Sequence, residues 1–236
     1  MTAVDGASWA ARRGDVTGLI GPNGAGKTTL INVVSGFVKP TSGRVLFEGR
    51  DLTGASPERM ARAGLIRTFQ LPRAFSRLTV IEILLVAAPH QRGEGVRGAV
   101  FGPAHWRTDE AGHQAKAWEI LELFEMTAAA NDPAANLSGG QKRMLELMRS
   151  LMTEPSLLLL DEPLAGLSGR WASILEEAVL KLKAQGLSLV LVEHELGIVE
   201  RLCDDVIVMA QGRVLSTGTM ADLRTRAEVQ AAYVIG

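Results

Sequence analysis

One glycine-rich stretch constrains the fold of this chain more than any other feature. It consists of Gly21, Pro22, Asn23, Gly24, Ala25, Gly26, Lys27, Thr28 and Thr29. The pattern GxxxxGK[ST] fits its first eight residues, and it lies between an apolar strand pattern at 15–20 and a helical pattern at 26–35. In that context backbone N–H groups and a helix N-terminus turn toward phosphate oxygens. The stretch therefore predicts a nucleoside triphosphate site, in which Lys27 reaches the β- and γ-phosphates and the Thr28 hydroxyl holds Mg²⁺.

Strand and helix patterns alternate along the rest of the chain. Strand patterns lie at 44–48, 65–69, 156–161, 187–193, 206–209 and 213–216. Helical patterns begin at Ser56 and cover 109–126, 139–153, 170–184 and 195–203. This alternation predicts an α/β fold with a mostly parallel sheet covered on both faces, and an antiparallel hairpin formed by the last two strands. Residues 87–108 are rich in glycine and read as an irregular insertion.

A few apolar positions carry predictions about packing. Trp118, Leu121 and Phe124 are expected to share one face of the helix at 109–126. The single cysteine, Cys203, lies in a helical pattern and is expected to be a buried, inert thiol. One cysteine permits no internal disulfide, which fits a reducing compartment.

Composition excludes several classes of function. The chain has 236 residues, a formal net charge of −1 and 47% hydrophobic residues, which suffice for one large domain with a sizeable core. A charge so close to zero provides no field that favours nucleic acid or an anionic membrane surface. No apolar run approaches the ~20 residues that cross a bilayer, so a membrane role would have to come through a partner.

A second element of the site is an apolar strand that ends in two acids. Residues 157–160 are all leucine, and Asp161 and Glu162 follow them. A carboxylate at the end of a buried strand can meet Mg²⁺, which is the role expected of Asp161. Glu162, one residue later, is placed to polarise an attacking water as a general base. Taken alone, this pair would more often be solvated charges at a strand end, and the glycine-rich stretch upstream favours the functional interpretation.

Two isolated polar residues follow other strands. Gln70 comes directly after 65–69, and its amide can ligate Mg²⁺ and contact water. His194 comes directly after 187–193, and an imidazole there can hydrogen-bond a γ-phosphate. Each would ordinarily be a solvated surface residue, and each gains weight only from the surrounding constellation.

A further glycine-rich helix start has no role at the first phosphate site. It consists of Leu137, Ser138, Gly139, Gly140 and Gln141. The simple interpretation is that Ser138 caps the helix at 139–153. The other interpretation is an anion cradle that faces the γ-phosphate of a second subunit, which gives a head-to-tail pair with two ATP molecules at its interface.

These motifs, in this order, closely resemble the nucleotide-binding subunits of ABC transporters, and the likeness covers nearly the whole chain. The resemblance implies a P-loop NTPase core at 1–77 and 130–236, with a helical subdomain inserted at 78–129. It implies ATP and Mg²⁺ as cofactors, with Thr28, Gln70 and Asp161 as metal ligands. It also implies Glu162 and His194 as catalytic residues, and 137–141 as a signature that acts on the partner's ATP.

Within that family the chain looks most like the ATPase subunits of branched-chain amino-acid importers. The supporting stretches are 66–70, 78–82, 165–167, 192–199 and 232–236. This likeness implies an ATPase that drives uptake of branched-chain amino acids or a related small polar solute from the cytoplasmic face of the membrane. The implied partners are a second ATPase subunit, identical or different, two permease subunits and an external solute-binding protein. A soluble ABC-type ATPase, or a regulatory module with little turnover, is the alternative.

Some residues depart from the family's pattern. Ser168 stands where the family carries Asp or Asn, and Gly169-Arg170-Trp171 replaces the usual continuation. The chain begins only some twenty residues before the glycine-rich stretch, so the family's first strand and its adenine-stacking aromatic are expected to lie further upstream. Trp9 falls in the expected second strand and reads as a core residue.

Overall fold

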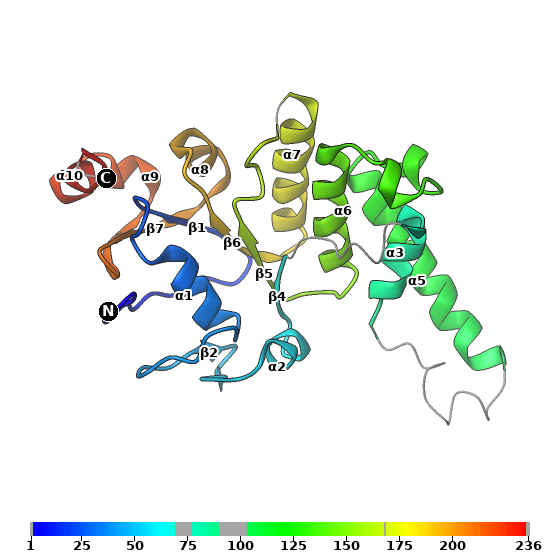
Figure 1. Cartoon of the computed structure of the whole chain (residues 1–236), viewed down its shortest axis with the longest axis horizontal. Helices are drawn as coiled ribbons and strands as arrows, with labels where there is room; N and C mark the ends of the chain where they lie inside the picture. Colours follow the sequence, from blue (N-terminus) through cyan, green and yellow to red (C-terminus); the bar gives the residue numbers. More distant parts are fainter. Residues whose placement is uncertain (1, 69–76, 90–102, 168, 235–236) are drawn as a thin grey trace. The chain divides into compact units, whose positions relative to one another are not determined.

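The computed structural model describes residues 2–68, 77–89, 103–167 and 169–234 (Figure 1). Its backbone divides into two units. The sheet unit comprises Met1–Thr68, Pro155–Gly166 and Val179–Gly236, and the helical unit comprises Phe69–Glu154 and Leu167–Ala178. The predicted inserted subdomain, 78–129, falls within the helical unit's range, and its boundaries stay a prediction.

The sheet unit is built on one six-stranded sheet. Its strands are β1 (Val16–Ile20), β4 (Leu65–Arg67), β5 (Leu157–Asp161), β6 (Ser188–Val192), β7 (Asp205–Ala210) and β8 (Arg213–Gly218). The spatial order is β4-β5-β6-β1-β7-β8, with the first five strands parallel and β8 antiparallel to β7. A separate antiparallel pair joins β2 (Leu46–Phe47) to β3 (Arg50–Asp51). The predicted mostly parallel sheet with an antiparallel portion is confirmed.

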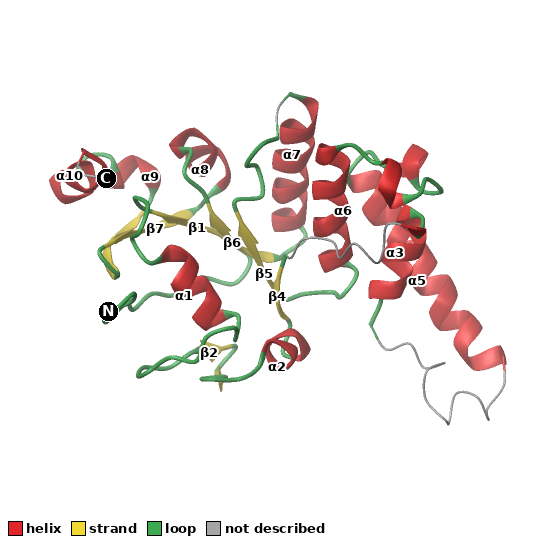
Figure 2. Cartoon of the chain, viewed as in Figure 1, coloured by secondary structure: helices red, strands yellow, loops and turns green. Residues whose placement is uncertain are grey.

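Helices cover both faces of this sheet because its central strands are apolar on both sides. The helices are α1 (Lys27–Val34), α2 (Pro57–Arg62), α8 (Leu196–Leu202), α9 (Met220–Leu223) and α10 (Ala227–Val234). Successive side chains of a strand point to opposite faces. Leu19 therefore joins a cluster with α1 and α2, whereas Ile20 joins another with α8, α9 and α10. Figure 2 shows α1 and α8 on opposite sides of the strands.

The helical unit packs three long or apolar helices around its own core. Its elements are α3 (Val80–Ala87), α5 (Pro103–Leu123), the short 3₁₀ turns Thr127–Ala129 and Ala134–Asn136, and α6 (Gly139–Leu151). Helix α7 (Arg170–Ala184) begins in this unit and continues into the sheet unit. The largest fully buried side chains in the helical unit are Ile83, Leu84, Leu121, Phe124, Met126, Met144, Leu145 and Met148.

The structure corrects the predictions for the insertion and for the helix that follows it. Helix α5 begins at Pro103, so residues 103–108 are helical rather than irregular. Residues 90–102 of the predicted insertion lie outside the described part of the chain. Trp118 is 43% exposed, whereas Leu121 and Phe124 are fully buried. Ala117 and Leu121, four residues apart, lie on the buried face of α5. Each residue is rotated by about 100° from the one before it, since 3.6 residues complete a turn, so Trp118 falls beside this face.

The structure also bears on the predictions for Trp9, for Cys203 and for membrane-spanning helices. Trp9 packs against the core as expected, but it is only partly buried and lies in no strand. Helices α9 and α10 were not predicted from the sequence patterns. Cys203 lies just after α8 and is partly rather than fully buried. Desolvation raises the pKa of its thiol to about 12, which disfavours the reactive thiolate. Within the described residues, no helix combines the length and the apolar character that crossing a bilayer requires.

Candidate functional site

The glycine-rich stretch forms the loop between β1 and α1, as its pattern predicts. Gly21 has φ +147°, and a Cβ atom built on it would lie 2.1 Å from the Met209 carbonyl oxygen of β7. Only glycine fits there, because its Cα comes so close to the backbone of the neighbouring strand that a side chain has no room. Gly26 has φ +98° and precedes the first residue of α1. The loop therefore ends at a helix N-terminus, the arrangement that binds phosphate groups.

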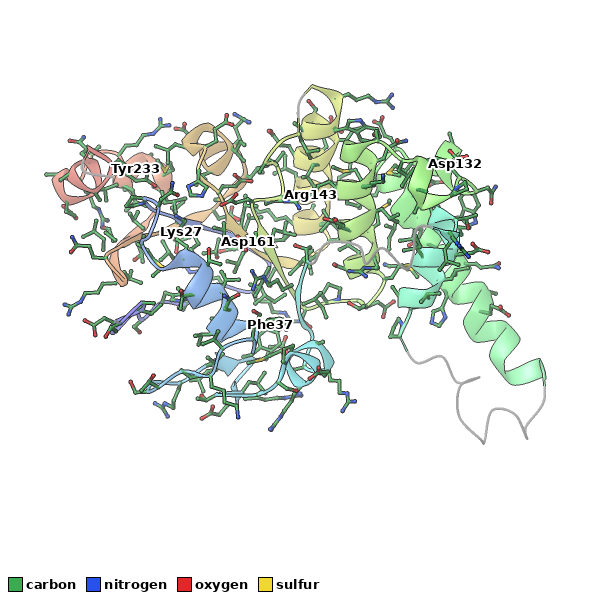
Figure 3. All side chains as sticks on the ribbon, in the orientation of Figure 1. Lys27, Phe37, Asp132, Arg143, Asp161 and Tyr233 are labelled. Carbon is green, nitrogen blue, oxygen red and sulfur yellow. The ribbon has the colours of Figure 1, made fainter. Side chains whose placement is uncertain are left out.

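Lys27 is folded into this loop. The residue is 6% exposed, and its Nζ donates hydrogen bonds to the carbonyl oxygens of Gly21, at 2.7 Å, and Pro22, at 3.0 Å. Desolvation lowers the pKa of the ammonium group, while the carboxylates of Glu162 and Asp161 act in the opposite direction. Lys27 therefore interacts electrostatically with both carboxylates of the acid pair. Figure 3 labels Lys27 and Asp161.

The acid pair lies where β5 ends. Asp161 is the last residue of the strand, opposite Val192 of β6. Glu162 follows with φ +48°, and its backbone N–H donates to the Val192 carbonyl oxygen at 3.0 Å. A left-handed backbone is unusual for a non-glycine residue, and such residues gather at functional sites.

The structure brings Glu162 and His194 together. The Glu162 Oε1 and the His194 Nε2 lie 2.8 Å apart, and the two side chains are 44% and 43% exposed. A carboxylate held by an imidazole and still open to solvent can accept a proton from water. The two residues predicted to be catalytic therefore share one hydrogen bond beside the predicted metal ligand.

The residues present fit a magnesium ion. Thr28 is exposed in the first turn of α1, and the Asp161 carboxylate is 25% exposed at the strand end. Hydroxyl and carboxylate oxygens are the donors that Mg²⁺ prefers, and it is usually held by one or two carboxylates together with substrate phosphates. In the described residues no three His, Cys, Asp or Glu side chains gather into a metal cage. Gln70, the third predicted ligand, lies outside the described residues, as does Ser168.

The second glycine-rich stretch belongs to the helical unit and begins α6. Ser138 caps the helix: its Oγ accepts from the Gln141 N–H at 3.3 Å, and the Gln141 Oε1 accepts from the Ser138 N–H at 2.9 Å. Leu137 is 5% exposed and anchors the stretch, whereas Gly139 is exposed. A Cβ atom on Gly140 would lie 2.6 Å from the Trp171 ring, so α7 packs directly on this helix start.

Two side chains at the site carry no assignment from the sequence motifs. Arg67, at the end of β4, places its Nη2 2.8 Å from the Asp161 Oδ2. Glu193 is 5% exposed and accepts a hydrogen bond from the Leu164 N–H at 3.2 Å. Both are charged residues within a predicted buried strand. Charged side chains are rarely buried unless they are paired, so this position in the sequence could have indicated a hydrogen-bond or ion-pair partner.

Comparison with known proteins places the chain in a family. Residues 4–165 match the ABC transporter family. The chain is 38% identical, over 99% of its length and 90% of the relative's, to a probable branched-chain amino acid transport ATP-binding protein LivG of Archaeoglobus fulgidus. It is 39% identical, over 99% of its length and 92% of the relative's, to the high-affinity branched-chain amino acid transport ATP-binding protein LivG of Salmonella typhimurium.

The fold agrees with these matches. A crystal structure of a nucleotide-free ATP-binding cassette from an ABC transporter superposes with a TM-score of 0.82 and 37% identity, covering 98% of this chain and 92% of that one. More than half of the chain matches the family, and the relatives are covered over most of their length. The chain therefore belongs to the ABC transporter family, among its ATP-binding proteins.

Proposed function

We propose that this chain is the ATP-hydrolysing subunit of an importer for branched-chain amino acids. The solute assignment rests on the relatives named for branched-chain amino acid transport, which align with 99% of the chain at 38–39% identity. The ATPase assignment rests above all on one observation, the contact between the Glu162 carboxylate and the His194 imidazole at the end of β5.

The chemistry follows from the position of each group. The loop at 21–29 holds the phosphates through its backbone N–H groups, and the Lys27 ammonium reaches the β- and γ-phosphates. Glu162 accepts the proton of the attacking water, and His194 orients Glu162 and the γ-phosphate. Thr28, Gln70 and Asp161 would hold Mg²⁺, which when bound neutralises charge on the phosphates.

The helix start at 137–141 completes the site of another subunit. Residues 137–141 are separate from the phosphate loop at 21–29. They form the exposed, capped N-terminus of α6, where the helix dipole favours an anion. We therefore assign a second ATPase subunit as a partner. Because the relatives are named as ATP-binding proteins of a transport system, we also assign permease subunits, with an external solute-binding protein acting through the permease. The chain would work at the cytoplasmic face of the membrane through these permease contacts.

The test is Glu162→Gln in the full chain. Losing a general base costs about 10²–10⁴-fold in turnover, whereas the amide preserves the size of the side chain. We expect ATP binding close to wild type, a steady-state ATPase rate lowered by at least about 100-fold, and an ATP-dependent dimer on size exclusion.

A matched control is available in the same unit. Glu48 also has a left-handed backbone, φ +49°, and lies exposed in the turn between β2 and β3. Glu48→Gln should leave turnover unchanged. An ATPase rate near wild type in Glu162→Gln would remove the general base from this proposal.

A further inference from the structure

The carboxylate assigned to the metal already has a cationic partner within the chain. The Arg67 guanidinium lies 2.8 Å from Asp161, although the two residues are 94 positions apart in the sequence. The parallel pairing of β4 with β5 brings them together at the ends of neighbouring strands. The ion pair is largely shielded from solvent: the Arg67 and Asp161 side chains are only 12% and 25% exposed.

The guanidinium is held from more than one side. Its Nη1 donates to the Asn32 Oδ1 at 2.5 Å, and Asn32 lies in α1, the helix that begins at the phosphate loop. Its Cζ lies 6.0 Å from the centre of the Phe37 ring, which stands just after α1 (Figure 3). A planar fork anchored on an amide and an aromatic ring has a defined orientation, so the charge is directed at Asp161.

We propose that Arg67 is a built-in counter-cation for Asp161, which stands in for the metal while the nucleotide site is empty and gives way to Mg²⁺ when nucleotide binds. Arg67 is then a positioning residue that acts on nucleotide through Asp161. The inference rests on the proposed function, because it requires that Asp161 face the phosphates of bound ATP.

The physical consequence is a linkage between Arg67 and the metal. Without metal, the guanidinium neutralises Asp161 and lessens its repulsion of the phosphates. With Mg²⁺ present, the metal supplies that positive charge, and the guanidinium becomes less important. Arg67 should therefore strengthen metal-free ATP binding more than it strengthens Mg²⁺-ATP binding.

The experiment measures the dissociation constant of a fluorescent ATP analogue in EDTA and in excess Mg²⁺. For Arg67→Gln we expect the constant to rise by up to about fivefold in EDTA, because Asp161 without its counter-charge repels the phosphates, and to change by less than about twofold in Mg²⁺. Arg67→Lys keeps the charge and should restore most of the metal-free affinity. No turnover is involved in this readout.

Matched variants isolate the charge at Asp161. Arg62→Gln removes the same charge from the exposed surface of α2 and should leave both constants unchanged. The double variant Arg67→Gln, Asp161→Asn lacks both charges, and its affinity in EDTA should return to the wild-type value. If Arg67→Gln fails to fold in a thermal melt, Asn32→Ala, which removes one anchor of the guanidinium, should shift the same ratio in the same direction.

The outcomes separate this inference from the proposed function. Equal losses of affinity in EDTA and in Mg²⁺, or no loss in either, would overturn the role of Arg67 and leave the ATPase assignment standing. Wild-type protein that binds the analogue under neither condition would instead contradict the nucleotide site itself.

Discussion

Glu193 illustrates how one buried carboxyl group ties together two segments of the site. It is 5% exposed, and it accepts a hydrogen bond from the Leu164 N–H, which lies just beyond the acid pair. Burial raises the pKa of Glu193, and the nearby Glu162 carboxylate acts in the same direction. Hydrogen bonds from the backbone of Leu164 and His194, and the His194 charge, oppose the shift. The raised pKa means that the folded protein holds this proton more firmly than the unfolded chain does.

Glu193→Gln should therefore stabilise the protein in a pH-dependent way. A carboxyl group whose folded pKa is raised contributes full stability below its unfolded pKa and loses that contribution as the pH rises through the folded value. The amide carries no charge at any pH, so the melting temperature of the variant should exceed wild type at pH 8, and the difference should shrink toward pH 5. Differential scanning fluorimetry at both pH values measures this.

The neighbouring exposed residue provides the control for that prediction. Glu195 precedes α8, and its side chain makes no capping hydrogen bond there. Glu195→Gln should show no comparable pH-dependent gain. A Glu193→Gln variant with the same melting-temperature difference at both pH values would contradict the assigned effect of burial.

At the scale of elements, the start of α6 and the start of α7 fit tightly against each other. Trp171 lies over Gly140, and the Arg170 Cζ lies 6.0 Å from the Trp171 ring centre. Arg170 also pairs with Glu125 at 2.6 Å, so the beginning of α7 is fixed within the helical unit. Trp171 thus packs against the proposed signature.

Gly140→Ala should lower stability, and Gly139→Ala is its matched control. A Cβ on Gly140 would meet Trp171 at 2.6 Å, whereas a Cβ on Gly139 meets nothing within 4 Å. Overpacking costs about 1–3 kcal/mol, while alanine at an open helical position is neutral or favourable. Urea unfolding of the nucleotide-free protein measures both variants, and Trp171→Ala should recover much of the loss in a double-mutant cycle. Equal effects of the two alanine substitutions on stability would show that the Trp171 ring moves aside without cost, which would contradict this prediction.

At the scale of the whole molecule, the proposed shared site makes activity depend on association. If Ser138 and its neighbours act on a second subunit, hydrolysis requires a pair, and the specific activity of the isolated chain should rise with its concentration. Ser138→Arg should abolish ATPase activity while leaving nucleotide affinity nearly unchanged. A steady-state ATPase series over protein concentration measures the first effect, and binding titrations measure the second.

Loss of a helix cap is the alternative cause that needs a control. Replacing a serine N-cap costs about 1 kcal/mol wherever it occurs. Ser56 caps α2 by accepting from the Arg59 N–H, far along the chain from the proposed signature. Ser56→Arg should lower stability comparably and keep ATPase activity. Constant specific activity from a protein shown to be a monomer would exclude the shared site.

Local patterns were enough to predict the α/β class and the framework of the site. The leucine run of β5 and the mostly apolar strands β1 and β6 indicate a covered parallel sheet, because strands buried on both faces are nearly continuous hydrophobic runs. The phosphate loop and the cap at Ser138 were equally predictable, since both depend on residues within a few positions of one another.

Only the tertiary structure decided which distant side chains meet. Arg67 and Asp161 are 94 residues apart, and Glu162 and His194 are 32 apart, so the register of β4, β5 and β6 had to be known before either contact could be named. The exposure of Trp118 likewise depends on which stripe of α5 its neighbours cover. Local periodicity reports how a segment folds, whereas a contact between segments is decided by the packing of whole elements, and no single segment carries that information.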